Sequence, residues 1–259
     1  MPPCGTLVSS VFRHVSACEE PQMGYSEPQT ITDDRVRFSA LGPNSEGVIR
    51  DGNHALFGVS TGNSYFSRRR LADAMAWATE RFAAVDVVYA DVALEAMLEA
   101  FGYEPPAARR SVAKQLRGMR RRISGACDDI GTAAEKVRAR PLSGFLAEPG
   151  YQEVRARTRT ALRTDVGLRA AQDTTAYQFL SSRLGPHGMP EPAQVRAALA
   201  YVEAELPFFI DTPRILGVAS SVHCYHSVLP LGHLLFGGDR PRGLRPADNQ
   251  GYAIVQCRD

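Results

Sequence analysis

The chain has 259 residues, of which 44% are hydrophobic and 22% charged, with a formal net charge of +2. These values are ordinary for a globular protein and leave ample chain for a sizeable core, in one large domain or two small ones. No run approaches the roughly 18 consecutive apolar residues that a membrane span needs, so we expect no membrane partner.

The cysteines predict neither a disulfide framework nor a metal site. They stand at positions 4, 18, 127, 224 and 257, an odd and scattered set without a CxxC pair. This usage is typical of a reducing cytoplasm. The N-terminus has neither a basic start nor an uninterrupted apolar segment, so it is a poor secretory signal and we expect a cytoplasmic protein.

Residues 1–45 are rich in Pro, Ser, Asp and Glu and show no sustained hydrophobic period. We predict a partly ordered N-terminal leader there, with one short strand near residues 36–38. The folded domain is expected to span residues 46–259.

The segment His54–Phe66, HALFGVSTGNSYF, is the most informative part of the chain. Its apolar run predicts a buried strand over residues 54–60, and apolar residues at helical spacing then predict a helix over 67–82. Between them lie small and turn-forming residues, Gly58, Ser60, Gly62 and Asn63. A strand, a tight turn and a helix hold a side chain over the carboxyl end of a parallel sheet, so we predict that Ser60 is a nucleophile.

The following elements alternate between strand and helix. We predict a strand over 86–92 and a helix over 93–101, and this β–α–β–α order predicts an α/β fold of the doubly wound type. Further along, the patterns predict a helix over 107–127, a short strand within 137–146, a helical region over 149–182, a helix over 192–206, a strand or strand pair within 215–226, and a closing strand over 252–255.

The helix predicted over 107–127 is strongly cationic outside one apolar stripe, which consists of Val112, Leu116, Met119 and Ile123. Its cations are Arg109, Arg110, Lys114, Arg117, Arg120, Arg121 and Arg122, with no acidic residue between positions 109 and 122. A solvated face normally mixes signs, because like charges four residues apart destabilise a helix. We therefore favour phosphate binding, through backbone contacts rather than base readout.

The pentapeptide Gly58–Gly62 also matches the G-x-S-x-G pattern of serine hydrolases. Such an enzyme needs a downstream acid and histidine, for which Glu205 with His223, His226 or His233 could serve. Against this interpretation, mostly irregular sequence precedes the elbow and no HGGG-like oxyanion segment lies upstream. Taken alone, the pentapeptide also fits a purely structural turn.

Several separated segments together resemble the cyclodipeptide synthase family. They are GVSTGNSYFS, DVVYAD, RGMRRRI, EPGYQEVRART, AYVEAELPFF and SSVHCYH, in this order, within residues 50–256. The resemblance implies a single Rossmann-like domain with a parallel sheet flanked by helices, similar to the catalytic domain of class I tyrosyl- and tryptophanyl-tRNA synthetases. It also implies an aminoacyltransferase that joins two aminoacyl-tRNAs into a cyclic dipeptide, a 2,5-diketopiperazine.

By this resemblance, Ser60 takes the first aminoacyl group as an ester. The second aminoacyl-tRNA is expected to donate its amine to that ester, giving a dipeptidyl-enzyme from which intramolecular attack releases the ring. Because each acyl group arrives as an activated ester, we expect neither ATP nor any other cofactor. The chain accordingly has no G-x-x-x-x-G-K-[ST] loop and no HIGH- or KMSKS-like segment.

The resemblance assigns further roles around Ser60. Glu205 holds the ammonium of the aminoacyl group, and Tyr201 and Tyr151 supply additional polar contacts. Tyr225 relays protons during ring closure, Asn63 positions the acyl group, and Gly58 leaves room for it. Asn63 with Tyr225 places the chain in the Asn/Tyr branch of the family, although His226 stands where Gln is more usual and Val228 where some relatives have a carboxylate.

The resemblance also predicts the binding surfaces. The first-substrate pocket would be lined by Leu56, Gly58, Val88, Leu142 and Phe208, which favours a bulky apolar amino acid such as Leu, Phe or Met. His223 is expected at the second pocket or its rim. The acceptor arm of the first tRNA would bind Arg110, Lys114, Arg117, Arg120, Arg121 and Arg122.

Two other functions are compatible with the residues alone. One is an esterase that uses the Gly58–Gly62 elbow, and the other is a non-catalytic tRNA-binding module built on a synthetase-like core.

Overall fold

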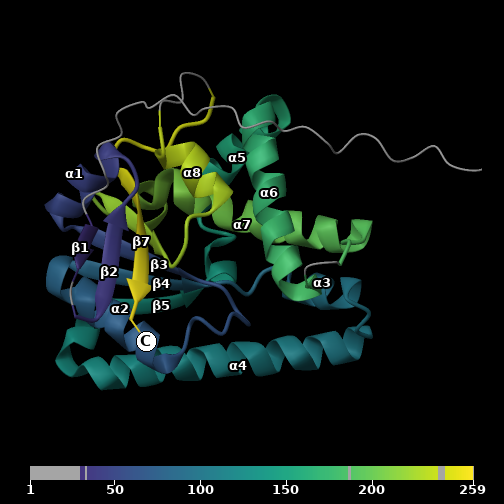
Figure 1. Ribbon diagram of the computed structural model, residues 1–259, viewed down its shortest axis with the longest axis horizontal. Coiled ribbons are helices and arrows are strands. Elements are labelled where there is room, and N and C mark those ends of the chain that lie inside the picture. The colour runs from purple at the N-terminus through teal and green to yellow at the C-terminus, as the bar shows by residue number, and fades with distance from the viewer. Residues whose placement is uncertain (1–29, 33, 186–187, 239–242, 259) are drawn as a thin grey trace, which may run out of the picture.

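A computed structural model describes residues 30–32, 34–185, 188–238 and 243–258 (Figure 1). Residues 1–29, the larger part of the predicted leader, lie outside these described residues. The strand predicted near residues 36–38 is confirmed as β2 (Val36–Ala40). It is followed directly by a helix that the sequence pattern did not indicate, α1 (Pro43–Asp51), so residues 36–45 lie within the folded unit.

In the described part of the chain, one sheet of seven strands has the order β1-β2-β7-β6-β3-β4-β5. The strands are β1 (Thr30–Thr32), β2, β3 (His54–Val59), β4 (Ala84–Tyr89), β5 (Val137–Pro141), β6 (Ser221–Tyr225) and β7 (Gln250–Cys257). The five strands from β7 to β5 run parallel, whereas β2 pairs antiparallel with β7 and β1 with β2. The predicted α/β class is therefore confirmed, with an antiparallel edge.

Alternate residues of β3 supply two different cores. Phe57 and Val59 pack with Trp77 on the face covered by α2 (Arg68–Arg81) and α4 (Pro105–Ile130). Leu56 packs with Phe208 on the opposite face. That face is covered by α3 (Leu94–Ala100), α5 (Pro149–Thr164), α6 (Val166–Leu184), α7 (Pro192–Leu216) and α8 (Pro230–Phe236). Both faces of the parallel strands are thus buried, as such sheets require.

Local signals placed α2 and α4 correctly. Ser67 caps α2 by accepting a hydrogen bond from the Arg70 backbone N–H at 3.3 Å. In α4, the stripe residues Val112, Met119 and Ile123 are buried; Met119 and Ile123 join the core that contains Trp77, and Val112 joins the core that contains Phe208. This helix runs along one whole side of the molecule (Figure 1).

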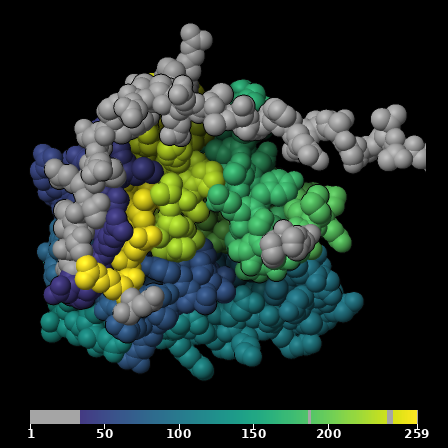
Figure 2. Space-filling model, viewed as in Figure 1, coloured from purple at the N-terminus to yellow at the C-terminus, as the bar shows by residue number. Residues whose placement is uncertain are grey.

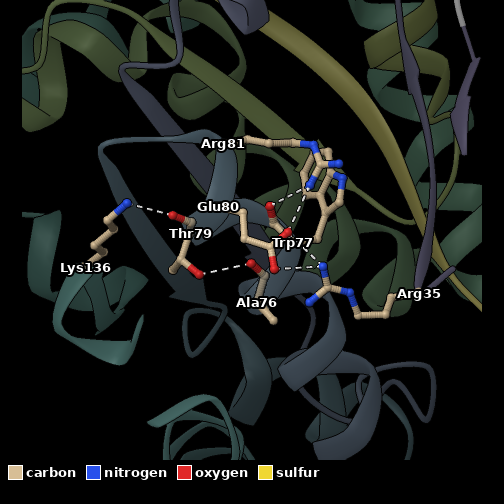
Figure 3. Close-up of polar contacts among 7 residues, drawn as sticks. All are labelled: Arg35, Ala76, Trp77, Thr79, Glu80, Arg81 and Lys136. Atoms are coloured by element: carbon tan, nitrogen blue, oxygen red, sulfur yellow. Dashed lines mark hydrogen bonds and ion pairs between the residues drawn. The ribbon is translucent and has the colours of Figure 1, made fainter. Parts of the chain in front are cut away.

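The C-terminal end of α2 is fastened to its surroundings by charged side chains (Figure 3). Lys136, at the end of the 3₁₀ helix η1 (Gly131–Lys136), donates from Nζ to the carbonyls of Thr79 and Phe82 at 2.7 and 3.3 Å. A cation there also interacts favourably with the helix dipole. Arg35 donates to both carboxylate oxygens of Glu80 at 2.8 and 2.7 Å. These contacts hold the far end of the helix that leads away from the Ser60 turn.

Two predicted helix boundaries were wrong. The helical region 149–182 divides at Asp165, whose carboxylate accepts the Leu168 N–H at 3.0 Å and caps α6. The helix predicted to end at residue 206 continues through Pro207 to Leu216, with a kink at Asp211 (φ −159°, ψ 64°). Phe208, Phe209 and Ile210 are all buried, and their burial offsets the roughly 3 kcal/mol that an interior proline costs a helix.

Candidate active site

Ser60 stands directly after β3, in the predicted turn. The turn is tied to the neighbouring strand because Thr61 Oγ1 donates to the Ala90 carbonyl. Gly62 adopts φ +84°, a left-handed conformation that favours glycine and sends the chain into α2. The serine is 8% exposed, so its hydroxyl lies just below the surface at the carboxyl edge of the sheet.

Two tyrosine hydroxyls meet the Ser60 hydroxyl from other elements. Tyr225, the last residue of β6, places its Oη 3.0 Å from Ser60 Oγ. Tyr201, on α7, donates to the same Oγ at 3.2 Å. Burial raises the pKa of Tyr225 to about 12 and that of Tyr201 well above its usual value, so both phenols are neutral at physiological pH. The two hydroxyls can therefore donate or relay a proton at this oxygen.

Glu205 lies one helical turn after Tyr201 on α7. Burial raises the pKa of its carboxyl group to about 7, and the hydrogen bond with the Tyr201 hydroxyl acts in the opposite direction. Near pH 7, both the protonated and the ionised form of Glu205 are therefore populated. A carboxyl group of this kind can hold an ammonium ion or accept its proton.

A narrow cavity is lined by Glu205 and by Tyr225, the tyrosine that contacts Ser60. All five residues predicted for the first pocket line it: Leu56, Gly58, Val88, Leu142 and Phe208. The remaining lining residues are Glu205, Phe209, His223, Tyr225 and Leu229. Its free volume is about 20 Å³, which is room for about one water, so a large side chain enters only when lining side chains move.

Asn63 and His226 form a second polar pair at the turn. Asn63 Oδ1 accepts the Tyr65 backbone N–H at 2.9 Å, and its Nδ2 lies 3.3 Å from His226 Nε2. The His226 ring stacks on Tyr65, with 4.2 Å between centroids. Burial and the positive charge of Arg70 both lower the pKa of His226. A neutral His226 ring can thus accept from Asn63, and Asn63 also acts to lower the pKa of Tyr225.

The cationic face of α4 reaches this same turn. Arg110, Lys114, Arg117, Arg120 and Arg121 are exposed, Arg122 is partly exposed, and among the described residues none of the six forms an ion pair. Figure 2 shows α4, in teal, along the lower edge of the molecule with side chains projecting outward. A groove lies between α4 and the turn, and Lys114 and Arg122 line it with Gly62 and Asn63. The groove therefore connects the cationic face of α4 with the turn that carries Ser60.

Comparison with known proteins decides what this arrangement belongs to. A family model described as cyclodipeptide synthase matches residues 36–257. The chain belongs to the cyclodipeptide synthase family. It is accordingly an aminoacyltransferase, and its substrates are aminoacyl-tRNAs.

Individual relatives agree with the family match. The cyclo(L-tyrosyl-L-tyrosyl) synthase of Mycobacterium tuberculosis (strain CDC 1551 / Oshkosh) is 38% identical over 234 residues, which cover 90% of this chain and 80% of that protein. The cyclo(L-leucyl-L-phenylalanyl) synthase of Streptomyces noursei is 37% identical over 227 residues, covering 88% and 94%.

Solved structures show the same fold. A crystal structure of a cyclo(L-leucyl-L-phenylalanyl) synthase superposes with a TM-score of 0.81 at 36% identity, covering 87% of this chain and all of that one. A Mycobacterium tuberculosis protein, described as demonstrating that cyclodipeptide synthetases are related to type I tRNA synthetases, gives 0.81 at 36% identity, covering 92% and 100%. The expected similarity to class I synthetases is therefore confirmed.

Not every predicted residue of this cyclodipeptide synthase reaches the cavity. Tyr151 is fully buried in α5, and its hydroxyl donates to the Ala204 carbonyl of α7 at 2.9 Å. It packs against Phe208, with 5.9 Å between ring centroids. The observed contacts fasten the α7 segment that carries Glu205, whereas a direct contact of Tyr151 with substrate stays a prediction.

His223 was expected at a second pocket, but it lines the same cavity as the predicted first-pocket residues. Phe209 and Leu229 line the cavity too and were not singled out from the sequence. The neighbouring Phe208 could have indicated Phe209, but only the continuation of α7 past Pro207 brings both rings to the cavity. Among the described residues, no histidine is hydrogen-bonded to Ser60, so the geometry does not favour the esterase interpretation.

The described residues contain neither a metal-binding cluster nor a membrane-spanning helix. No group of three or more His, Cys, Asp and Glu residues is arranged to hold a metal ion. No helix in the same part of the chain is long and apolar enough to cross a membrane.

Proposed function

We propose that this protein makes a cyclic dipeptide by a ping-pong mechanism with Ser60 as the covalent nucleophile. The observation that carries the proposal is the contact of Ser60 Oγ with two neutral tyrosine hydroxyls beside a cavity that also holds Glu205. In the first step, Ser60 Oγ attacks the ester carbon of an aminoacyl-tRNA. The ester bond to the terminal ribose breaks, the ribose oxygen takes up a proton, and the tRNA leaves.

The bonds that form and break in the second step decide which amine attacks which ester. They reverse the direction of attack expected from the sequence. If the second aminoacyl-tRNA attacked the Ser60 ester with its amine, the dipeptide would remain on the tRNA. A dipeptidyl-enzyme forms only when the amine of aminoacyl-Ser60 attacks the ester of the second aminoacyl-tRNA. The new terminal amine then attacks the Ser60 ester, which closes the ring and restores the serine hydroxyl.

The surrounding residues supply the proton transfers. Glu205, with its pKa near 7, can hold the ammonium group and then take its proton, which leaves the nucleophilic amine. Tyr225 and Tyr201 can return a proton to Ser60 Oγ as the ring leaves. Asn63 stabilises the turn by accepting the Tyr65 backbone N–H and lies next to His226.

The substrates follow from the two surfaces. The unpaired cations of α4 would bind the acceptor arm of the first tRNA, because each phosphate contact releases bound counterions. The cavity is lined mainly by apolar and aromatic side chains, which favours a large, mainly apolar first amino acid. Relatives that are 37–38% identical are named for tyrosyl, leucyl and phenylalanyl products, which are consistent with such a pocket.

Trapping of radiolabelled aminoacyl groups tests the mechanism. The wild-type protein should retain acid-stable label from aminoacyl-tRNA and release a diketopiperazine, while Ser60→Ala should lose both. Ser39→Ala, on the partly exposed strand β2, is the matched control and should keep both activities. Label that persists in Ser60→Ala would refute the covalent role of Ser60. Retarded migration of tRNA without any product, for every variant, would instead support a binding module.

A further inference from the structure

The cavity contains one polar side chain that the proposed mechanism does not use. Three of its lining residues carry polar groups: Glu205, Tyr225 and His223. Glu205 and Tyr225 act at Ser60. His223, on β6, lies beside Leu56 of β3 in the parallel pairing and is only 4% exposed.

Packing fixes the orientation of the His223 ring. It stacks on Phe209 with 4.4 Å between centroids and on Tyr252 with 5.7 Å. A Cβ atom at Gly58 would lie 3.1 Å from His223 Nε2, so the glycine leaves this edge of the ring open. Because Gly58 and His223 both line the cavity, Nε2 is the edge available to an occupant.

The ring lacks the hydrogen bonds that a buried imidazole normally makes. Nδ1 is enclosed and has no hydrogen-bond partner within the described residues. Burial lowers the pKa of His223 to about 4, although the nearby Phe208 backbone acts in the other direction, so the ring is neutral at pH 7. A neutral imidazole can both donate and accept a hydrogen bond. A buried polar atom without a hydrogen-bond partner costs free energy of folding.

We propose that His223 selects a first amino acid whose large side chain ends in a hydrogen-bonding group, with the phenol hydroxyl of tyrosine as the best match. A hydroxyl can satisfy Nε2 in either tautomer, because it both donates and accepts. The phenyl and aliphatic side chains of Phe and Leu would leave Nε2 unpaired. This inference rests on the proposed function of the cavity. It replaces the bulky apolar first amino acid predicted from the sequence with a large one that ends in a hydrogen-bonding group.

Sites that hydrogen-bond a substrate hydroxyl reject the analogue without it far more strongly than apolar pockets separate neighbours by size. Tyrosine and phenylalanine differ only by that hydroxyl, so their ratio isolates the contribution of His223. Entry of either ring requires the same movement of lining side chains, and this cost cancels in the ratio.

The experiment is a competition among purified tyrosyl-, tryptophanyl-, phenylalanyl- and leucyl-tRNA at equal concentrations, with mass spectrometry of the aminoacyl group trapped on Ser60. We expect the wild-type protein to take tyrosyl over phenylalanyl by at least about tenfold. His223→Leu should reduce this ratio to about one or below. His223→Gln, which keeps a donor and an acceptor, should retain part of the preference. Cys224→Ala, on the same strand but packed in the opposite core, should leave the ratio unchanged.

Each outcome has a distinct meaning. Equal trapping of tyrosyl and phenylalanyl groups by the wild-type protein refutes the role of His223, even if no variant folds. A preference that survives in a folded His223→Leu variant refutes it as well. Preferred trapping of the tryptophanyl group would support recognition of a donor but refute the phenol as the best match. Absence of any trapped group refutes the covalent mechanism and this inference together.

Discussion

The two ends of the same parallel strands carry serine sites of opposite character. At the amino end, His54 begins β3 and Ser221 begins β6, and His54 Nδ1 lies 2.8 Å from Ser221 Oγ. His54 Nε2 lies 3.0 Å from a carboxylate oxygen of Asp86, on β4. At the carboxyl end, Ser60 contacts two tyrosines beside a cavity.

The amino-end cluster of His54, Asp86 and Ser221 has the residue types of a serine hydrolase triad, but it is too deeply buried for a substrate to reach it. His54, Asp86 and Ser221 are at most 1% exposed, whereas Ser60 is 8% exposed. The serine bonds Nδ1, and the Asp86 oxygen that faces His54, Oδ2, also accepts from Arg138 at 2.7 Å. Residue types alone therefore do not make a site, because a reacting atom also needs space for the substrate.

The carboxyl groups of Asp86, at the amino end, and Glu205, at the carboxyl end, have pKa values shifted in opposite directions. Burial acts to raise the pKa of Asp86, but hydrogen bonds and charges from His54 and Arg138 outweigh it and hold the pKa below its usual value. Within the described residues no cation pairs with Glu205 in this way, so burial prevails and its pKa rises to about 7. A charge that is paired within the fold stabilises the structure, whereas a charge left for a ligand destabilises it.

Among the substitutions that test the difference between the two ends of the sheet, Asp86→Ala should change the free energy of unfolding most. The substitution leaves His54 without its acceptor and Arg138 without its partner, and we expect the free energy of unfolding to fall by about 3 kcal/mol. Trapping of aminoacyl groups per folded molecule should stay near the wild-type level. Urea unfolding followed by circular dichroism gives the first quantity. An unchanged midpoint would show that this end of the sheet is not a stabilising cluster.

Glu205→Gln is expected to change the free energy of unfolding less, and in the opposite direction. The folded Glu205 binds its proton up to about pH 7, whereas the unfolded group releases it near 4.5, so its contribution to stability falls as pH rises between these values. At pH 8 the substitution should therefore raise the free energy of unfolding, by about 2 kcal/mol, with little change at pH 4. For Asp86 the sign reverses: its contribution is present above the unfolded pKa and is lost as pH falls below it.

Activity completes the test of Glu205. If the carboxylate accepts the ammonium proton, the rate of the wild-type protein should rise through about pH 7 and the rate of Glu205→Gln should be low throughout. Single-turnover measurements of diketopiperazine formation would show this. A Glu205→Gln variant that is less stable at pH 8, or that keeps the wild-type pH profile, would contradict the comparison.

The smallest effect concerns the surface that leads to the carboxyl-end site. Replacing Arg121 and Arg122 by Ala should weaken tRNA binding by about tenfold and reduce the slope of log affinity against log salt, because fewer counterions are released. Stability should change little, since neither side chain forms an ion pair within the described residues. Arg37→Ala with Arg50→Ala removes the same charge from a distant surface and should leave the slope unchanged. An unchanged slope for the α4 variant would remove the assigned role of that helix.

Local patterns predicted the elements on which the site is built. The apolar run, the turn residues and the helical spacing of apolar residues gave correct positions for β3, the Ser60 turn and α2. The stripe in α4 was also correct, because its spacing depends only on helix geometry. The end of α7 was not predictable in this way, since Pro207 is a local signal to stop that is overridden by the burial of Phe208 and Phe209.

The sequence by itself determined the family, the Ser60 turn and the cationic helix, because each depends on residues that are close together in the chain. Only the tertiary structure decided that Tyr225 meets Ser60 across 165 positions, that His223 faces the first cavity, and that Tyr151 holds α7. These contacts depend on the order in which parallel strands pair and on which face a helix presents. Chain spacing alone does not contain that information.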